Sequence, residues 1–368
     1  MSIKNFSLQH PYSARIKNRT LLTGPTSTRK TYHVVLEVAS DAFSLKVGDS
    51  IGVIAHNDPE EVAKILHLLG LNGKEEILNP RTNTNDSIGD YLLHKANIHR
   101  ISPPFFRTIC NDQDLLQNKA KLIELLHSHI VSEILSKYQL QNLSDLTKLM
   151  PLLPRFYSIA NSRLVFPEEI HLTLAHVSYI ANGRVRTGVA SHFLITLAKP
   201  NETPIPIYLQ PSHHFTLPED PNASIILVGP GTGIAPFRAF LQEKLARQAS
   251  GRSWLFFGER NQSTDFYYEP FLTELVKQNH LRLDLAFSRD SSSKVYVQHR
   301  MYEHRKSLWA WLQEGAYFYL CGNADVMAKD VDAMLHQIVR EEGSMTEENA
   351  RLYIKKLRTD KRYLADVY

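Results

Sequence analysis

The chain has 368 residues, of which 43% are hydrophobic and 22% charged, and its formal net charge is +4. This length and composition suit a globular protein of two domains and exclude a disordered or fibrous chain. Such a small positive excess predicts no nucleic-acid partner. The first 18 residues lack a secretion signal, and no run approaches about 20 apolar residues. We therefore expect a cytoplasmic protein that does not enter a membrane.

Cysteine and histidine usage argues against metal chemistry. The only two cysteines, Cys110 and Cys321, are too few for a disulfide framework or an all-cysteine metal site. The 17 histidines form no evident cluster of ligands in the sequence. We predict no metal site, so any electron chemistry needs an organic cofactor.

The first part of the chain shows strand patterns on both sides of a long helical stretch. Strand patterns occur at 32–38, 47–54, 155–160, 170–176 and 205–209. Helical periods dominate 59–149, with few strand signals, and Asn182-Gly183 and Pro218 mark turns. These patterns predict an antiparallel β-barrel domain over 1–218, interrupted by a helical insertion at about 58–150.

The second part alternates short apolar strands with amphipathic helices. Residues 224–228 and 253–257 are two such strands. This alternation is typical of a parallel α/β sheet. We therefore expect a second, α/β domain over 219–368, with the boundary near 217–222.

A glycine-rich turn follows the first of these strands. It contains Gly231, Thr232 and Gly233 within the run 228–238 and precedes a predicted helix. Glycines let the backbone approach phosphate oxygens closely, and the start of a helix favours negative charge. The turn is a candidate pyrophosphate site. The alternative is a tight turn that only needs glycine, because the spacing departs from the usual dinucleotide fingerprint.

A second cluster lies after the strand at 282–287, at a predicted carboxyl-end edge of the sheet, where ligands bind in such folds. Its members are Ser288, Arg289, Lys294, Tyr296 and Gln298. A guanidinium, an ammonium and hydroxyls together suit a ribose 2′-phosphate, which favours NADPH over NADH. The alternative is a solvated basic loop.

A third cluster opens the strand at 155–160. Arg155 can pair with a cofactor pyrophosphate and Tyr157 can lie against a flat ring. The turn of Gly188, Val189, Ala190 and Ser191 leads into a helix-like segment whose start can hold phosphates. The alternative is that Arg155 and Tyr157 are ordinary half-exposed strand residues, but two phosphate-holding sites in one chain weaken it.

Taken together, these motifs resemble the ferredoxin–NADP reductase module of diflavin reductases, most closely that of the NADPH–sulfite reductase flavoprotein subunit. The resemblance covers nearly the whole chain and extends to Trp254–Glu259, Cys321-Gly322 and the final run 362–368. It implies that FAD is held by Arg155, Tyr157, Ser158, Thr173, Tyr179, Gly188, Val189, Ala190, Ser191 and Tyr368. It implies that NADPH is held by Gly231, Thr232, Gly233, Ser288, Arg289, Lys294, Tyr296, Gln298 and Asp330.

The resemblance also implies a hydride-transfer cluster of Ser158, Cys321 and Asp366 beside flavin N5 and the nicotinamide. A hydroxyl can hydrogen-bond near N5, a thiol can pack beside the nicotinamide, and a carboxylate can stabilise the developing positive charge. Without the resemblance, Cys321 alone is best interpreted as a small buried hydrophobe. Tyr368 is implied to cover the isoalloxazine face and to move aside for nicotinamide.

Diflavin reductases of full length carry an FMN domain before this module, whereas the present chain starts about where the module begins. We therefore expect a separate electron acceptor: a haemoprotein such as that of sulfite reductase, a flavodoxin, a ferredoxin or a small molecule. Two alternatives are an NADPH-dependent reductase of free flavin or quinone, and a non-catalytic nucleotide-binding subunit. The joint presence of Ser158, Cys321, Asp366 and Tyr368 favours an enzyme over the latter.

Overall fold

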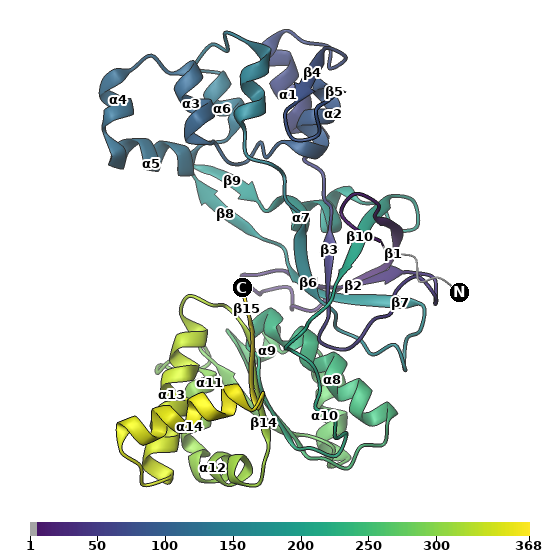
Figure 1. Cartoon of the computed structure of the whole chain (residues 1–368), viewed down its shortest axis with the longest axis vertical. Helices are drawn as coiled ribbons and strands as arrows, with labels where there is room; N and C mark the ends of the chain where they lie inside the picture. The colour runs from purple at the N-terminus through teal and green to yellow at the C-terminus, as the bar shows by residue number, and fades with distance from the viewer. Residues whose placement is uncertain (1–5) are drawn as a thin grey trace.

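The computed structural model describes residues 6–368, and its first domain is built on six antiparallel strands (Figure 1). These strands are β1 Tyr12–Leu21, β2 Thr31–Glu37, β3 Ser50–Val53, β6 Arg155–Ser158, β7 Glu169–Ala175 and β10 Pro204–Gln210. They lie in the order β6-β3-β10-β1-β2-β7. A bridge between Ile159 and Leu172 joins the continuation of β6 to β7 and closes the sheet. The predicted barrel is confirmed.

Strand β1 is the barrel strand that our sequence patterns missed. Only Ala14 and Ile16 are buried in its first half, and the register to β2 shifts between Ile16 and Asn18. Such a bulge breaks the alternation of inward and outward side chains. A strand of this kind has no clear period of two in its sequence.

The insertion between β3 and β6 forms a separate lobe with its own hydrophobic core around Tyr91, Phe105 and Phe106 (Figure 1). Its helices are α1 Pro59–Leu69, α2 Ile88–Asp90, the π-helix η1 Tyr91–Lys95, α3 Pro103–Ile109, α4 Gln113–Gln117, α5 Lys119–Ser128, α6 Val131–Leu135 and the 3-10 helix η2 Leu143–Lys148. The lobe also holds a hairpin of β4 Glu76–Asn79 and β5 Thr84–Ser87 that the helical prediction missed. Strand β5 is polar throughout, so no apolar alternation marks it.

A second hairpin connects this lobe to the barrel. Strands β8 Ser178–Ala181 and β9 Arg184–Thr187 turn at Asn182-Gly183, where both residues have positive φ as a two-residue turn requires. The buried Glu133 of α6 pairs with Arg186 at 2.5 Å and with Arg184 at 3.2 Å. The chain continues into α7 Val189–His192 and the π-helix η3 Phe193–Leu197. The ion pairs attach the helical lobe to the strand that leads into α7.

The second domain is a five-stranded sheet in the order β13-β12-β11-β14-β15, with all neighbours parallel. Its strands are β11 Ile225–Val228, β12 Ser253–Glu259, β13 Arg282–Phe287, β14 Tyr317–Gly322 and β15 Tyr363–Val367. Its helices are η4 Gly231–Gly233, α8 Ile234–Ala246, α9 Gln262–Asp265, α10 Glu269–Lys277, α11 Val297–Glu303, α12 Arg305–Gln313, α13 Met327–Glu342 and α14 Glu347–Thr359. Two hydrophobic clusters cover the sheet, and the fold class is confirmed.

The predicted boundary after residue 218 falls between β10 and β11, and the limits of the two domains stay predictions. Across residues 6–368, no helix combines the length and apolar character that a membrane span requires.

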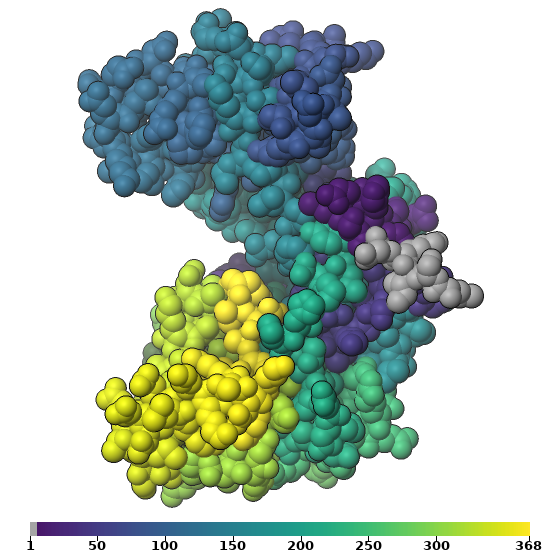
Figure 2. Space-filling view, in the orientation of Figure 1, coloured from purple at the N-terminus to yellow at the C-terminus, as the bar shows by residue number. Residues whose placement is uncertain are grey.

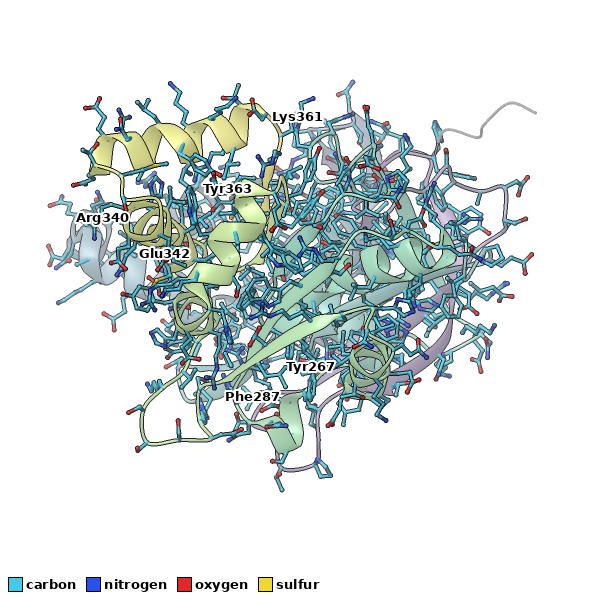
Figure 3. The ribbon with its side chains drawn as sticks, turned by 90° about the horizontal axis from the view of Figure 1, so that it is seen from below. Tyr267, Phe287, Arg340, Glu342, Lys361 and Tyr363 are labelled. Atoms are coloured by element: carbon cyan, nitrogen blue, oxygen red, sulfur yellow. The ribbon has the colours of Figure 1, made fainter. Side chains whose placement is uncertain are left out.

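The barrel and the α/β domain meet through buried hydroxyl groups. The hydroxyl of Tyr267, which Figure 3 labels, lies 2.9 Å from Thr31 Oγ1 on β2. The neighbouring Tyr268 hydroxyl lies 2.9 Å from His33 Nδ1 and 2.5 Å from Thr173 Oγ1. Two adjacent tyrosines of one domain thus bond to two strands of the other, which fixes how the domains are placed.

A partly buried arginine continues this interface. Arg238 of α8 donates to the carbonyl of Ala160 at 2.6 Å and to His171 Nδ1 at 3.3 Å. His171 Nε2 lies 2.6 Å from a carboxylate oxygen of Glu169 and donates to it. A histidine that accepts at one nitrogen and donates at the other is neutral. The contact with Arg238 therefore depends on an uncharged His171.

We predict that acid weakens this interface. Burial, and then the charge of Arg238, lowers the pKa of His33 to about 3. Burial foremost, with Arg238 adding to it, lowers the pKa of His171 to about 4 against the opposing effect of Glu169. Both stay neutral in the folded state while the unfolded chain takes up protons below about pH 6.5. The free energy of unfolding should fall by up to about 1.4 kcal/mol per pH unit for each histidine as the pH drops from there.

Denaturant unfolding between pH 7.5 and 4.5 measures this loss. A His33→Gln/His171→Gln variant should be less stable at pH 7.5 but should lose less stability toward pH 4.5 than the wild type. Equal losses in the two proteins would contradict the assignment.

Candidate active site

Two residues far apart in sequence meet where the barrel approaches the parallel sheet. Ser158 ends β6, and its hydroxyl donates to Asp366 Oδ2 on β15 at 3.1 Å. Burial raises the pKa of Asp366, although the Ser158 hydrogen bond opposes that rise. The carboxylate is thus a charge held close to a low-dielectric region. Such a charge interacts strongly with a positive charge that develops beside it.

Cys321 lies directly beside Asp366, because the two residues are partners in the parallel pairing of β14 and β15. Its side chain is fully buried. Burial, and then the charge of Asp366, raises the pKa of the Cys321 thiol well above its usual range. The thiol therefore stays protonated and acts as a packing group and weak donor rather than as a nucleophile.

Tyr368 follows these residues at the end of β15. Its hydroxyl lies 2.7 Å from Thr232 Oγ1, in the glycine-rich turn. The structure thus brings together Ser158, Cys321 and Asp366, the members of the predicted hydride-transfer cluster, and places Tyr368 two residues after Asp366. Their roles in catalysis stay predictions.

The glycine-rich turn is shaped by its packing. A Cβ on Gly229 would lie 2.5 Å from the ring of Phe237, and one on Gly233 would lie 2.2 Å from the carbonyl of Cys321. Gly231 has a φ of +59° and nothing within 4 Å of its Cβ position. Gly233 therefore allows the turn to pack against β14, Gly229 makes room for Phe237 of α8, and Gly231 presents its backbone to open space. This arrangement fits a pyrophosphate approaching the start of α8.

On the barrel side, Arg155 and Tyr157 occupy alternate positions of β6, next to Ser158. Arg155 is exposed, and burial raises the pKa of Tyr157 to about 12 while Arg155 acts against this rise. A neutral phenol beside an exposed guanidinium suits a flat ring followed by a pyrophosphate. Both residues are therefore well placed to hold FAD.

The turn of Gly188, Val189, Ala190 and Ser191 forms the start of α7. Ser191 Oγ donates to the carbonyl of Gly188 at 3.0 Å and accepts from the amide of Val177 at 3.2 Å. These bonds stabilise the turn, and the first N–H groups of a helix have no partner within it. They are available to phosphate oxygens, as the FAD prediction requires.

Thr173 and Tyr179 lie in different surroundings. Thr173 is buried on β7 and its hydroxyl bonds to Tyr268 in the domain interface. Tyr179 is half-exposed on β8. Their contacts with FAD stay predictions, and the Thr173 hydroxyl already has a protein partner.

The predicted 2′-phosphate residues gather after β13. The amides of Ser288 and Arg289 donate to the carbonyls of Glu259 and Arg260, which end and follow β12, at 2.9 and 2.8 Å. The side chains of Arg289, Lys294 and Tyr296 are exposed. Further along, Gln298 Nε2 donates to Asp330 Oδ2 at 3.4 Å. The cluster thus lies at the carboxyl edge of the sheet.

Two further arginines belong to this region and were missed. Burial, and then the charges of Arg29 and Arg289, lowers the pKa of Arg260, so both of those guanidiniums lie within electrostatic range of Arg260. Arg29, from the loop before β2, also pairs with Glu259 at 3.6 Å. The carboxyl-edge rule that selected Arg289 applies equally to Arg260. Arg29 carries no such signal, because it comes from the other domain.

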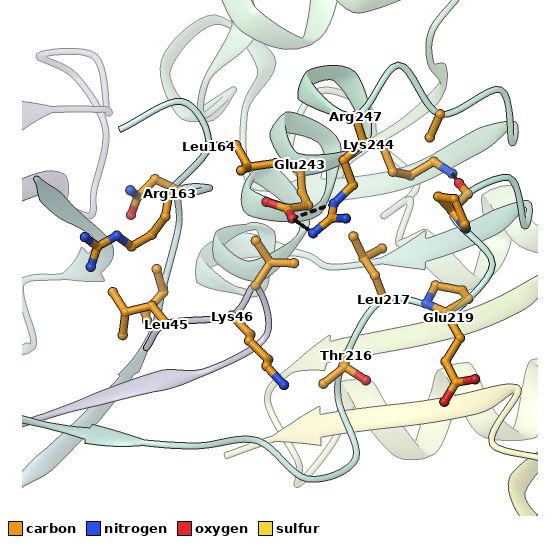
Figure 4. Close-up of a pocket in the computed structure, with 16 residues that line it drawn as sticks. Leu45, Lys46, Arg163, Leu164, Thr216, Leu217, Glu219, Glu243, Lys244 and Arg247 are labelled. Atoms are coloured by element: carbon orange, nitrogen blue, oxygen red, sulfur yellow. Dashed lines mark hydrogen bonds and ion pairs between the residues drawn. The ribbon is translucent and has the colours of Figure 1, made fainter. Parts of the chain in front are cut away.

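Figure 2 shows the surface hollowed between the helical insertion and the α/β domain, and β15 ends near this hollow in Figure 1. A separate cavity of about 380 Å³ lies at the domain junction near Lys46, Arg163 and Thr216 (Figure 4). It shares no residue with the predicted site. At the edge of this cavity, Glu243 of α8 pairs with Arg247 at 2.6 Å, four residues further along the chain.

Comparison with known proteins finds a matching family for each domain. Residues 4–86 and 106–193 match the FAD binding domain family, and residues 227–333 match the oxidoreductase NAD-binding domain family. The predicted cofactors, FAD and NADPH, are confirmed at the level of these two domains.

Curated relatives are similar along the whole chain. The chain is 39% identical over 383 residues to the sulfite reductase [NADPH] flavoprotein alpha-component of Shewanella sp. (strain MR-4), covering 100% of this chain and 62% of the relative. It is 39% identical over 373 residues to that of Vibrio cholerae (strain El Tor Inaba N16961), covering 99% of this chain and 60% of the relative. It is 37% identical over 379 residues to that of Mannheimia succiniciproducens, covering 100% of this chain and 62% of the relative.

The chain therefore spans about three-fifths of the length of the curated relatives it matches. With its closed antiparallel barrel and its five-stranded parallel sheet, it combines an FAD binding domain with an oxidoreductase NAD-binding domain, and it is similar in sequence to the sulfite reductase flavoproteins.

Proposed function

We propose that the chain accepts electrons from NADPH on bound FAD and passes them to a separate acceptor. The observation that carries this proposal is the meeting of Ser158, Asp366 and Cys321 at the junction of the FAD-binding and NAD-binding domains. One comes from the barrel and two from the parallel sheet. A binding protein without turnover has no need of such a junction.

FAD supplies the chemistry, because a flavin takes up two electrons as hydride and releases them singly. The residues of the chain orient the cofactors and polarise the place where hydride is transferred. Arg155 and the Gly188–Ser191 turn bind phosphate, and Tyr157 packs against the ring system. Ser158 holds Asp366 in place through the 3.1 Å hydrogen bond, and Asp366 stabilises positive charge on the nicotinamide side. Cys321, uncharged and buried, excludes water from the same point.

NADPH selectivity rests on positive charge at the carboxyl edge of the sheet. The guanidiniums of Arg289 and Arg29 both lie within electrostatic range of Arg260, and Glu259 pairs with Arg29 at 3.6 Å. A 2′-phosphate placed among them would relieve their mutual repulsion and accept charge-assisted hydrogen bonds. NADH lacks this phosphate and gains nothing from these residues.

We propose as acceptor a protein of the kind that completes a sulfite reductase, since the relatives are named alpha-components of that enzyme. A haemoprotein of that enzyme is the first candidate, and a flavodoxin or ferredoxin the second. The rival function is the reduction of free flavin or quinone.

The test starts with the absorption spectrum of the purified protein. Bound FAD should bleach on anaerobic addition of NADPH. The reduced protein is then mixed separately with sulfite reductase haemoprotein, flavodoxin, free FMN and a quinone. Fast reoxidation by one protein and slow reoxidation by the small molecules supports the proposal. Failure of NADPH to reduce bound FAD overturns it.

Replacing Arg289 should remove the preference for NADPH. The Arg289→Ala variant loses charge-assisted hydrogen bonds, which lowers affinity for NADPH by roughly 10- to 100-fold and leaves that for NADH unchanged. Rates of FAD reduction over a range of NADPH and NADH concentrations measure both. Arg351→Ala, at an exposed position of α14, is the matched control and should behave as wild type. A preference for NADPH that survives in Arg289→Ala would contradict the assignment.

Replacing Asp366 should slow the reduction of FAD. Asp366→Asn keeps the size and the acceptor for Ser158 but removes the charge, and we expect a loss of about two orders of magnitude at saturating NADPH. Because burial raises the pKa of Asp366, the wild-type rate should fall toward acid at a higher pH than an ordinary aspartate would give. The variant should lack this fall.

Stopped-flow reduction at several pH values checks both expectations for Asp366. Binding of 2′,5′-ADP serves as the control, since it reports the adenosine half of the site and should not change. An unchanged rate and pH profile in Asp366→Asn would exclude an electrostatic role.

A further inference from the structure

The backbone of Tyr368 is fixed to the sheet. Its amide donates to the carbonyl of Gly322 at 3.0 Å, and its own carbonyl accepts from the amide of Ala324 at 3.0 Å. These bonds hold the main chain of Tyr368 at both its amide and its carbonyl. Any displacement of the aromatic ring must therefore come from rotation about its side-chain bonds and not from movement of the strand.

The ring itself is much less constrained. Tyr368 is 51% exposed, so side chains of the protein cover only about half of it. Its hydroxyl is the exception, at 2.7 Å from Thr232 Oγ1. Since neither hydroxyl is charged, this is a neutral hydrogen bond of ordinary strength.

Thr232 is a rigid partner for this bond. It lies between Gly231, whose φ is +59°, and Gly233, which packs against the carbonyl of Cys321. A side chain would strain the backbone at position 231 and would clash with the carbonyl of Cys321 at position 233. The hydrogen bond thus joins a fixed turn to a fixed strand through one rotatable ring.

We propose that Thr232 is a positioning residue, whose hydroxyl latches the ring of Tyr368 in the covering position until NADPH arrives. The inference rests on the proposed function and on the role that the family resemblance implies for Tyr368, which is to cover the flavin. Nicotinamide reaches the flavin only after the ring rotates, and that rotation breaks the bond to Thr232. No covalent bond changes in this step.

The position of the latch couples it to cofactor binding. The Gly231–Gly233 turn is the proposed pyrophosphate site, so the cofactor arrives at the same turn that holds the ring. The Thr232 hydroxyl can then turn from Tyr368 to a phosphate oxygen. One neutral hydrogen bond is strong enough to favour the closed ring and weak enough to be exchanged during turnover.

Calorimetric titration of the oxidised, FAD-loaded protein tests the latch. The ligands are NADP⁺, which must displace the ring, and 2′,5′-ADP, which lacks the nicotinamide and need not. Tyr368→Phe removes the hydroxyl and leaves Thr232 in place, so NADP⁺ should bind about two- to tenfold more tightly while 2′,5′-ADP binds as before. Thr232→Ser keeps a hydroxyl and should match wild type.

Two further comparisons test whether the change in NADP⁺ affinity comes from the hydrogen bond between Thr232 and Tyr368. Tyr353→Phe removes a phenol hydroxyl that bonds to Gln313 elsewhere in the same domain, and it should leave both affinities unchanged. In a double-mutant cycle, Thr232→Val should change NADP⁺ affinity differently in the wild-type and Tyr368→Phe backgrounds.

Failure of the latch and failure of the proposed function give different results in this titration. Additive effects of the two substitutions, no tightening of NADP⁺ in Tyr368→Phe, or an equal change for 2′,5′-ADP would overturn the latch and leave the proposed function standing. Failure of 2′,5′-ADP to bind the wild type would overturn the proposed function, and the latch with it.

Discussion

The hydrogen bond between Ser158 and Asp366 is the point on which the site depends, because it joins residues 208 positions apart across the junction of two domains. Ser158 is placed by the pairing of β6 with β3, and Asp366 by the pairing of β15 with β14. Neither domain contains both groups. A site of this kind exists only while the two domains hold one relative position.

That relative position is maintained by buried polar contacts rather than by a large apolar interface alone. Tyr267, Tyr268 and Arg238 of the α/β domain bond to Thr31, Thr173, His33, His171 and the carbonyl of Ala160 on the barrel side. Buried hydrogen bonds are directional, and an unmade one is costly. They therefore specify one orientation of the domains more narrowly than apolar packing would. Because two of the groups are histidines, these contacts also make the interface sensitive to acid.

Much of the fold followed from local patterns in the sequence. Apolar strands alternating with helices predicted the parallel sheet, and the strand patterns on both sides of a helical stretch predicted the barrel and its insertion. The patterns failed for β1, where a bulge interrupts the alternation, and for β5, which is polar throughout. In both strands pairing with a neighbour, not the side-chain pattern, decides the structure.

The site was predictable to the extent that each part carries its own motif. The glycine turn and Ser288-Arg289 each follow a strand, so the carboxyl-edge rule located them. Contacts between the domains have no such signal. The position of Arg29 and the engagement of Thr173 by Tyr268 became visible only with both domains in place, and the pairing of Thr232 with Tyr368 became visible only with β15 placed in the sheet.

The central claim is that this junction brings the nicotinamide directly onto one face of the flavin. Stopped-flow reduction of bound FAD by the two stereoisomers of C4-deuterated NADPH tests it most directly. Direct transfer in a fixed geometry predicts that one isomer reduces FAD more slowly than unlabelled NADPH and that the other reduces it at the same rate. Equal rates with all three would contradict the account.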